Sequence, residues 1–107
     1  NNIDEASDEI INEVAWILAT TPKRSLKRAR YALRIIDKRM QDSTLAREKP
    51  EFLDTWAAAL AANGQFEKAI EIQNQAISKA TEQDRDDVLQ ILERHLKSFK
   101  LNQPITE

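Results

Sequence analysis

Hydrophobic residues recur every three or four positions through most of the chain, which is the spacing expected of amphipathic α-helices. The clearest example is residues 51–80, where two such patterns are separated by Asn63 and Gly64. Glycine readily adopts the left-handed backbone conformation that ends a helix, so the chain can reverse direction at this point. We therefore expect residues 51–80 to form an antiparallel helical hairpin whose first helix begins near Pro50.

An earlier stretch of the chain carries the same periodicity. It predicts a helix that begins at Ser7, or one turn earlier at Asp4, because a serine hydroxyl can cap the first backbone N–H groups of a helix. Pro22 ends this helix, since the residue before a proline is disfavoured in the α conformation. The expected apolar stripe of the helix comprises Ile10, Ile11, Val14, Ile17 and Leu18.

A second helix is predicted from Lys23 or Ser25 to Met40, with apolar residues at helical spacing from Leu26 onwards. Residues 41–50 lack this periodicity and predict a connector that contains at most a short helical turn. The first two helices are therefore expected to be joined to the later hairpin by an irregular segment.

The last periodic stretch predicts a fifth helix, which starts between Thr81 and Asp84 with one of these two residues as its N-cap and runs to about Lys100. The residues that stop this helix and leave a short tail are Asn102, Gln103 and Pro104. We therefore expect a single all-α domain over residues 1–107, built from about five helices arranged as stacked helical hairpins.

The composition agrees with a helical protein and excludes some classes of protein. Ala, Leu, Ile, Glu, Lys, Arg and Gln are abundant, whereas the 107 residues include one Gly and three Pro. The chain has no Cys, which excludes disulfide bonds and thiolate metal sites. No apolar run approaches the length of about 18 residues that spans a bilayer. Since the chain starts at Asn1 and not at Met, it can be an excised piece of a longer protein, and the sequence leaves its compartment open.

The two halves of the chain repeat one another. Residues 11–19 align with residues 53–61 at a shift of 42 positions, and the helix that follows each segment aligns at a shift of 44 positions. The difference falls in the turn between the helices, where insertions are tolerated. A helical hairpin repeated in this way indicates stacked units and not a single irregular bundle.

The unit over residues 51–80 resembles a tetratricopeptide repeat, a family of helical hairpins with a set pattern of small and large residues. The residues that match this pattern are Trp56, Ala57, Leu60, Gly64, Phe66, Ala69 and Ala76. The unit departs from the pattern at Leu53, Gln73 and Thr81. By the same resemblance, residues 7–40 form a divergent repeat and residues 82–100 form the capping helix of a bacterial-type tandem. This slightly favours the bacterial cytoplasm as the compartment.

In this family the first helix of each repeat lines a concave groove that holds a peptide. Carried over by alignment, the groove residues here are Glu9, Asn12, Glu13, Trp16, Asp54, Thr55, Ala58, Ala61 and Ala62. This lining is acidic and partly apolar, so the resemblance implies a protein or peptide partner with a basic or apolar segment, and no cofactor. Two repeats are fewer than the roughly three that a stable stack needs, so we expect the chain either to rely on its capping helix, to pair with a copy of itself or to continue the stack in a longer parent protein.

Charge is distributed unevenly along the chain, with a net charge of −5 over residues 1–21, +7 over residues 22–49 and −4 over residues 50–107. The second predicted helix carries a basic ridge formed by Lys23, Lys27, Arg30, Arg34 and Lys38. Such a ridge can bind nucleic-acid phosphates, an anionic membrane surface or an acidic protein, or it can be a solvated outer face. Tyr31 is the only aromatic residue in this helix, which argues against stacking on bases and hence against nucleic acid.

The sequence contains no catalytic constellation and no metal-binding motif. His95, the only histidine, is expected on the inner or edge face of the last helix and has no Ser or Cys nucleophile pattern around it. The acidic residues near the start of the last helix are typical of a helix N-terminus and do not fit a calcium-binding loop. We therefore predict a non-enzymatic protein-interaction or scaffold module. The alternatives are an electrostatic binder that uses the basic helix over residues 23–40 and an accessory domain of a larger enzyme.

Overall fold

Five α-helices and two short 3-10 turns make up the computed structural model, which describes residues 2–23 and 25–107. The helices are α1 (Asp8–Thr20), α2 (Leu26–Asp42), α3 (Pro50–Ala62), α4 (Phe66–Glu82) and α5 (Asp86–Lys100), and the 3-10 turns are η1 (Asn2–Glu5) and η2 (Ala46–Glu48). No β-strand occurs in these residues, so the prediction of an all-α fold with five helices is confirmed. No helix in this part of the chain is both long enough and apolar enough to cross a membrane.

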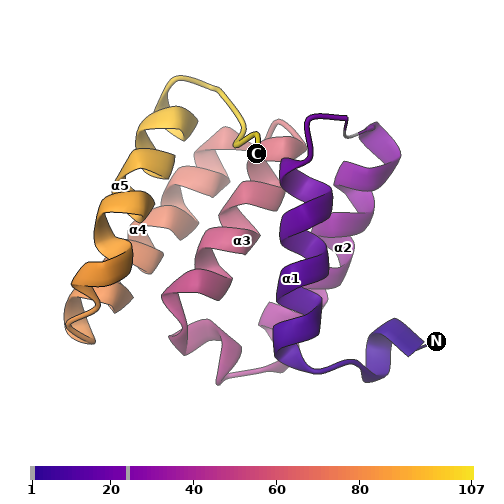
Figure 1. The fold of residues 1–107 in the computed structure, drawn as a ribbon, viewed down its shortest axis with the longest axis horizontal. Helices are drawn as coiled ribbons and strands as arrows, with labels where there is room; N and C mark the ends of the chain where they lie inside the picture. Colours follow the sequence, from indigo (N-terminus) through magenta and orange to yellow (C-terminus); the bar gives the residue numbers. More distant parts are fainter. Residues whose placement is uncertain (1, 24) are drawn as a thin grey trace.

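The helices form two layers. In Figure 1, α1, α3 and α5 lie in the front layer, and α2 and α4 lie behind them. α1 packs against α2 and α3 packs against α4 as antiparallel pairs, while α5 packs mainly on α4. The second pair is the hairpin predicted for residues 51–80, and α5 covers one side of the stack. After α5 the chain crosses the end of α3, and its last residues lie beside α1.

Local residue choices determine where the first three helices start. Ser7 Oγ accepts a hydrogen bond from the Ile10 N–H at 3.3 Å, and Ser25 Oγ accepts one from the Arg28 N–H at 3.2 Å. Pro50 is the first residue of α3, a position at which the missing N–H has no intrahelical partner to lose. The predicted starts at Ser7, Ser25 and Pro50 are therefore confirmed.

One type of reversal ends each of the last three helices. The turn residue has a left-handed backbone in each case, with φ of 78° at Gly64, 54° at Asp84 and 58° at Asn102. The N–H of the next residue donates to the carbonyl five positions earlier, at 2.8 to 2.9 Å. The α4–α5 turn therefore repeats the predicted glycine turn, with Asp84 at the glycine position.

The fifth helix begins later than predicted. α4 continues to Glu82, so Thr81 lies inside it and donates a hydrogen bond from its hydroxyl to the Ile77 carbonyl at 2.9 Å. Asp84 lies in the turn, and α5 begins at Asp86 without a side-chain cap. The prediction that Thr81 or Asp84 caps this helix is therefore wrong, because the aspartate takes the left-handed position that glycine occupies in the preceding turn.

Small residues allow the helices of the core to approach closely. Ala57, Ala69 and Ala76, which the hairpin pattern requires to be small, have no exposed surface. Larger side chains fill the remaining space, and the fully buried ones include Ile36, Met40, Leu53, Leu92 and Phe99. They come from α2, α3 and α5, so the core is continuous from the first hairpin to the closing helix.

The apolar stripe predicted for the first helix is only partly buried. Ile11 is 2% exposed, whereas Ile10 and Ile17 are 51% and 55% exposed. α1 lies at one end of the front layer and packs on α2 and α3, with no described helix on its outer side (Figure 1). Ile10 and Ile17 therefore lie at the solvent-exposed edges of the predicted stripe, because periodicity does not show which flank of a helix has a neighbour.

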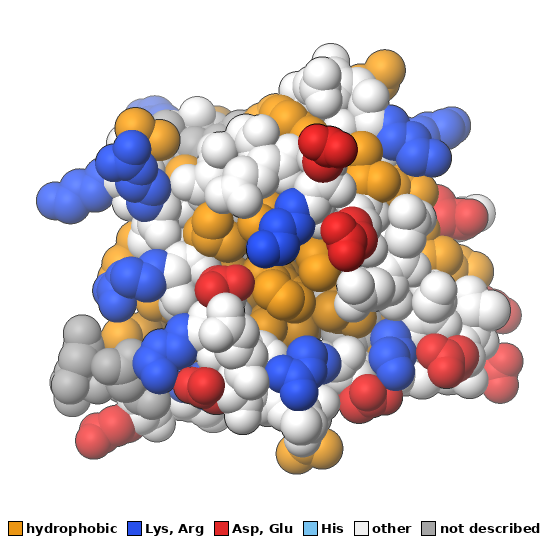
Figure 2. Space-filling model, turned by 180° about the vertical axis from the view of Figure 1, so that it is seen from behind, with side chains coloured by type: hydrophobic (Ala, Val, Ile, Leu, Met, Phe, Trp, Pro, Cys, Tyr) orange, Lys and Arg blue, Asp and Glu red, His pale blue; other side chains and the backbone are white. Residues whose placement is uncertain are grey.

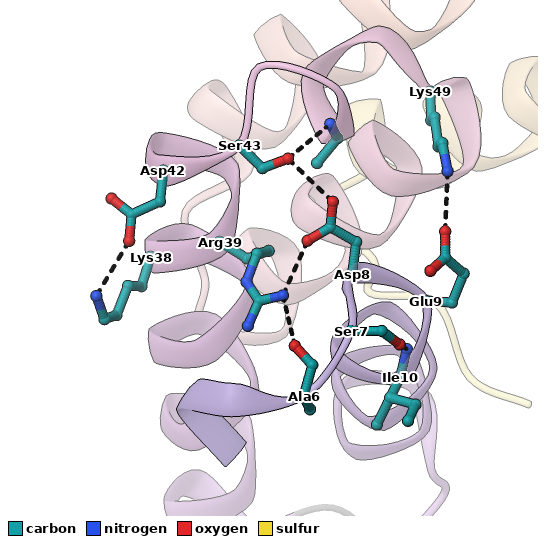
Figure 3. A network of polar contacts seen from close by, with 11 residues as sticks. Ala6, Ser7, Asp8, Glu9, Ile10, Lys38, Arg39, Asp42, Ser43 and Lys49 are labelled. Carbon is teal, nitrogen blue, oxygen red and sulfur yellow. Dashed lines mark hydrogen bonds and ion pairs between the residues drawn. The ribbon is translucent and has the colours of Figure 1, made fainter. Parts of the chain in front are cut away.

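A network of polar contacts ties the start of α1 to the end of α2 (Figure 3). Asp8 accepts hydrogen bonds from Arg39 Nη1 at 2.8 Å and from Ser43 Oγ at 2.9 Å. The same Arg39 nitrogen donates to the Ala6 carbonyl at 2.8 Å. These hydrogen bonds to Asp8, chiefly the one from Arg39, lower the pKa of its carboxyl group below the ordinary value of 3.8.

The lowered pKa of Asp8 predicts a loss of stability in acid. Its contribution is complete above the unfolded pKa and is lost as the pH falls through the folded pKa. We expect the free energy of unfolding to decrease between about pH 5 and pH 2 by more in the native chain than in Asp8→Asn. Urea denaturation at a series of pH values measures this difference, and parallel pH profiles would contradict it. The pKa values of Glu9 and Asp87 are also lowered, but both groups are present in both proteins, so their contributions to the pH dependence cancel in the comparison.

Candidate interaction face

The face formed by α1, α3 and α5, which we call the front face, carries the residues that the tetratricopeptide resemblance assigns to a groove. On α1, Glu9 and Glu13 are exposed, and Asn12 and Trp16 are half-buried. On α3, Ala62 is half-buried. The other four assigned residues are buried, namely Asp54, Thr55, Ala58 and Ala61. The α1 side of the front face is therefore open to solvent, whereas the α3 side is covered by other parts of the chain.

Residues 103–107, which we call the tail, lie across one end of the front face (Figure 1). The Glu107 N–H donates to the Thr20 carbonyl at the end of α1 at 2.8 Å. The Glu107 carboxylate accepts a hydrogen bond from Trp16 Nε1 at 2.9 Å. Ile105 is 8% exposed and belongs to the hydrophobic core. The tail therefore connects the end of α5 to α1 without forming a helix of its own.

A buried polar cluster joins α3, α4 and α5 behind the exposed part of the front face. Asp54 is 7% exposed. Gln73 Nε2 donates hydrogen bonds to Asp54 Oδ1 and to the Leu92 carbonyl, both at 2.9 Å. His95 Nδ1 lies 2.9 and 3.2 Å from the two oxygens of the same carboxyl group. Asp54 is therefore the shared partner of a residue from each of the two helices that follow it.

The cluster gives a physical reason for Gln73, one of the positions where the chain departs from the tetratricopeptide pattern. Gln73 has no exposed surface, and a buried amide requires hydrogen-bond partners. An aromatic side chain at this position would leave Asp54 and the Leu92 carbonyl without the donor that they share. The tetratricopeptide resemblance places Asp54 in the groove and helical periodicity places His95 on an inner or edge face, but neither pattern contains a signal for the contact between them.

Trp16 links α1 to this cluster. The centroids of its ring and the His95 ring are 5.6 Å apart, and the ring planes are tilted by 37°. Its indole nitrogen donates to Glu107 in the tail. Trp16 therefore contacts both α5 and the tail, so the two residues most central to the predicted groove, Trp16 and Asp54, are connected through His95.

The chemistry of the front face is hydrogen bonding, ring stacking and the burial of apolar groups. The side chains that contact His95 are those of Asp54 and Trp16. Neither side chain is a hydroxyl or thiol nucleophile that a histidine could activate. In residues 2–23 and 25–107, no three His, Asp or Glu side chains lie close enough together to hold a metal ion. These interactions are the ones by which a protein surface holds a peptide segment.

The basic ridge of α2 lies on the other side of the molecule. Figure 2 shows this side, where basic side chains gather towards the left edge of the view, over α2. All five residues assigned to the ridge are exposed: Lys23, Lys27, Arg30, Arg34 and Lys38. Lys38 forms an ion pair with Asp42 at 3.0 Å, and no ion pair to a described residue involves the other four. The charge of the ridge is therefore largely uncompensated within the described chain.

No protein-family model, curated protein or solved structure matches the chain. The fold itself defines an all-α protein in which stacked helical hairpins are followed by a closing helix. The resemblance to tetratricopeptide repeats rests on the residues of the 51–80 hairpin.

Proposed function

We propose that the chain is a tetratricopeptide-like interaction module that holds an extended segment of a partner protein on its front face. The observation that supports this function is the tail, which lies on that face with one buried side chain and two hydrogen bonds to α1. A surface that holds a non-helical segment of its own chain offers the contacts needed to hold one from another protein. In this proposal the partner segment takes the place of the tail.

The contacts of the tail indicate what the partner segment carries. Ile105 is buried, so the segment needs an apolar side chain of similar size at that point. The Thr20 carbonyl accepts a backbone N–H, which any residue except proline supplies. Glu13 is exposed, and Glu9 remains 67% exposed although it pairs with Lys49. Basic residues that flank the apolar side chain are therefore favoured by charge.

Release of the tail tests this function in the full-length chain. Ile105→Asp places a charge at a buried apolar position and is expected to detach the tail without removing a helix. A peptide with the sequence of residues 101–107 is then expected to bind the variant with a Kd of about 0.1–1 mM, because few contacts offset the loss of rigid-body freedom. The native chain is expected to bind it about two- to tenfold more weakly, since its own tail competes at an effective concentration on the order of 1 mM. The indole N–H resonance of Trp16 reports both states.

Thr106→Asp is the matched control, because Thr106 is exposed and adjacent to Ile105. This variant is expected to keep the tail in place and to behave as the native chain does towards the peptide. Adding Trp16→Ala to Ile105→Asp should weaken peptide binding by at least about tenfold, since the indole is one of the groups that hold the tail. Because this variant lacks the Trp16 resonance, its binding is measured by the fluorescence anisotropy of the labelled peptide. A folded Ile105→Asp variant that does not bind the peptide at millimolar concentration would sink the proposal.

A further inference from the structure

The basic ridge borders two hollows on the side of the molecule opposite the front face. The residues that line the first hollow include Leu18, Tyr31, Lys23, Lys27, Arg30 and Arg34. Those that line the second include Leu26, Leu33, Leu60, Lys68, Arg30 and Arg34, together with one acidic residue, Asp37. Arg30 and Arg34 line both hollows, so they stand between them. In Figure 2, basic side chains lie along the α2 side of this surface and hydrophobic side chains are visible towards its centre.

We propose that this surface binds an acidic segment of a partner protein that also carries bulky apolar side chains. The acidic groups contact Arg30 and Arg34 on the ridge, and the apolar side chains enter the hollows on either side. This partner differs in charge from the one proposed for the front face, where exposed acidic residues favour a basic segment. The two surfaces therefore bind different segments.

The charge of the ridge points to a negatively charged partner. Lys23, Lys27, Arg30 and Arg34 form no ion pair with a described residue. Of the five helices, α2 alone has no acidic residue in its first turn, and it carries Lys27 there. A cation near a helix N-terminus opposes the helix dipole and lowers the stability of the helix. An acidic partner would offset this repulsion.

The apolar side chains in the hollows distinguish a protein segment from nucleic acid and from a membrane. Tyr31 is the only aromatic residue at the ridge, and the Arg34 guanidinium carbon already lies 4.9 Å from its ring centroid, so the ring is not free for stacking on a base. Leu18 and Leu33 are half-buried and Leu60 is 2% exposed, whereas Leu26, which also lines the second hollow, is 61% exposed. One projecting leucine is too little apolar surface to insert into a bilayer, whereas the recessed side chains beside it can receive apolar side chains of a peptide.

Fluorescence anisotropy with the full-length chain tests the proposal. The probe is a labelled peptide rich in Glu and Leu, compared with the same peptide in which each Leu is replaced by Ala. We expect the native chain to bind the Glu/Leu peptide at least about tenfold more tightly than the Glu/Ala peptide, because buried apolar side chains add to the affinity. Arg30→Glu combined with Arg34→Glu should weaken binding of the Glu/Leu peptide by at least about tenfold, because it replaces attraction by repulsion. The matched control, Arg94→Glu combined with Lys97→Glu, makes the same charge change on exposed residues of α5 and should change the affinity by less than twofold.

Each of the other outcomes would overturn the proposal. Equal affinity for the two peptides would mean that the surface attracts acidic peptides by charge alone and that the hollows receive no apolar side chains. Tighter binding to single-stranded RNA or to phosphatidylserine vesicles, lost on reversal of Arg30 and Arg34, would assign the ridge to that ligand. Self-association lost in the same variant, measured by sedimentation, would assign it to a second copy of the chain. Circular dichroism of each variant ensures that a loss of binding is not a loss of fold.

Discussion

Replacement of Asp54 by Ala is expected to lower the free energy of unfolding by about 3 kcal/mol, because it removes the shared partner of two groups inside the stack. Gln73 has no exposed surface, and its Oε1 already lacks a hydrogen-bond partner in the described chain. Without Asp54 its Nε2 would keep only the Leu92 carbonyl, and His95 Nδ1 would lose both carboxyl contacts. Thermal denaturation followed by circular dichroism should show a midpoint lower by more than about 10 °C.

Two controls separate the effect of the cluster from that of an acidic residue in general. Asp54→Asn keeps the shape of the side chain and an oxygen that can accept from Gln73, so a smaller loss of about 1 kcal/mol is expected. Glu71→Ala removes an exposed acid from α4 and should change stability by less than about 0.5 kcal/mol. If Asp54→Ala were as stable as Glu71→Ala, the cluster would not hold α3, α4 and α5 together.

Helix boundaries could be predicted from the sequence where a single residue determines them. Ser7, Ser25 and Pro50 act through the backbone of their own helix, and Gly64 acts through its own φ angle. Asp84 could not be predicted in the same way, because aspartate is commoner as an N-cap than in the left-handed region. Its conformation is imposed by the packing of α5 on α4, which requires the same reversal that Gly64 provides between α3 and α4.

The contacts of the front face depend on information that local patterns do not carry. Alignment with a repeat family indicated that Asp54 and Trp16 share a face, but the histidine that connects them lies 41 residues after Asp54. The tail has no helical periodicity, so the sequence predicts only a short segment after the last helix. The position of the tail on the front face is fixed by contacts of two residues. Ile105 is buried, and Glu107 forms two hydrogen bonds to α1. A single isoleucine in a polar segment is too weak a signal to predict such a contact.

Truncation of Phe99 is the prediction with the largest expected effect. Phe99 is among the fully buried side chains and has no exposed surface, and Phe→Ala changes in cores cost about 3–5 kcal/mol through lost burial and the cavity that remains. That loss is a large part of the roughly 5–15 kcal/mol by which domains are stable. Phe99 lies in the last turn of α5, just before the tail, so its truncation should loosen the closing helix and the segment on the front face together.

Two spectroscopic probes can show whether α5 leaves the stack before the rest unfolds. In a Trp56→Phe background, fluorescence reports Trp16, which contacts His95 on α5 and Glu107 in the tail. For Phe99→Ala we expect the fluorescence transition at lower urea concentration than the circular dichroism transition, whereas the two should coincide in the background protein. Ile91→Ala, which truncates a 47% exposed residue on the same helix, should cost less than about 1 kcal/mol and keep the transitions together.

A loss below about 1 kcal/mol in Phe99→Ala would mean that the closing helix is not held by its buried aromatic side chain. The front face would then have to be maintained by the polar cluster around Asp54 alone.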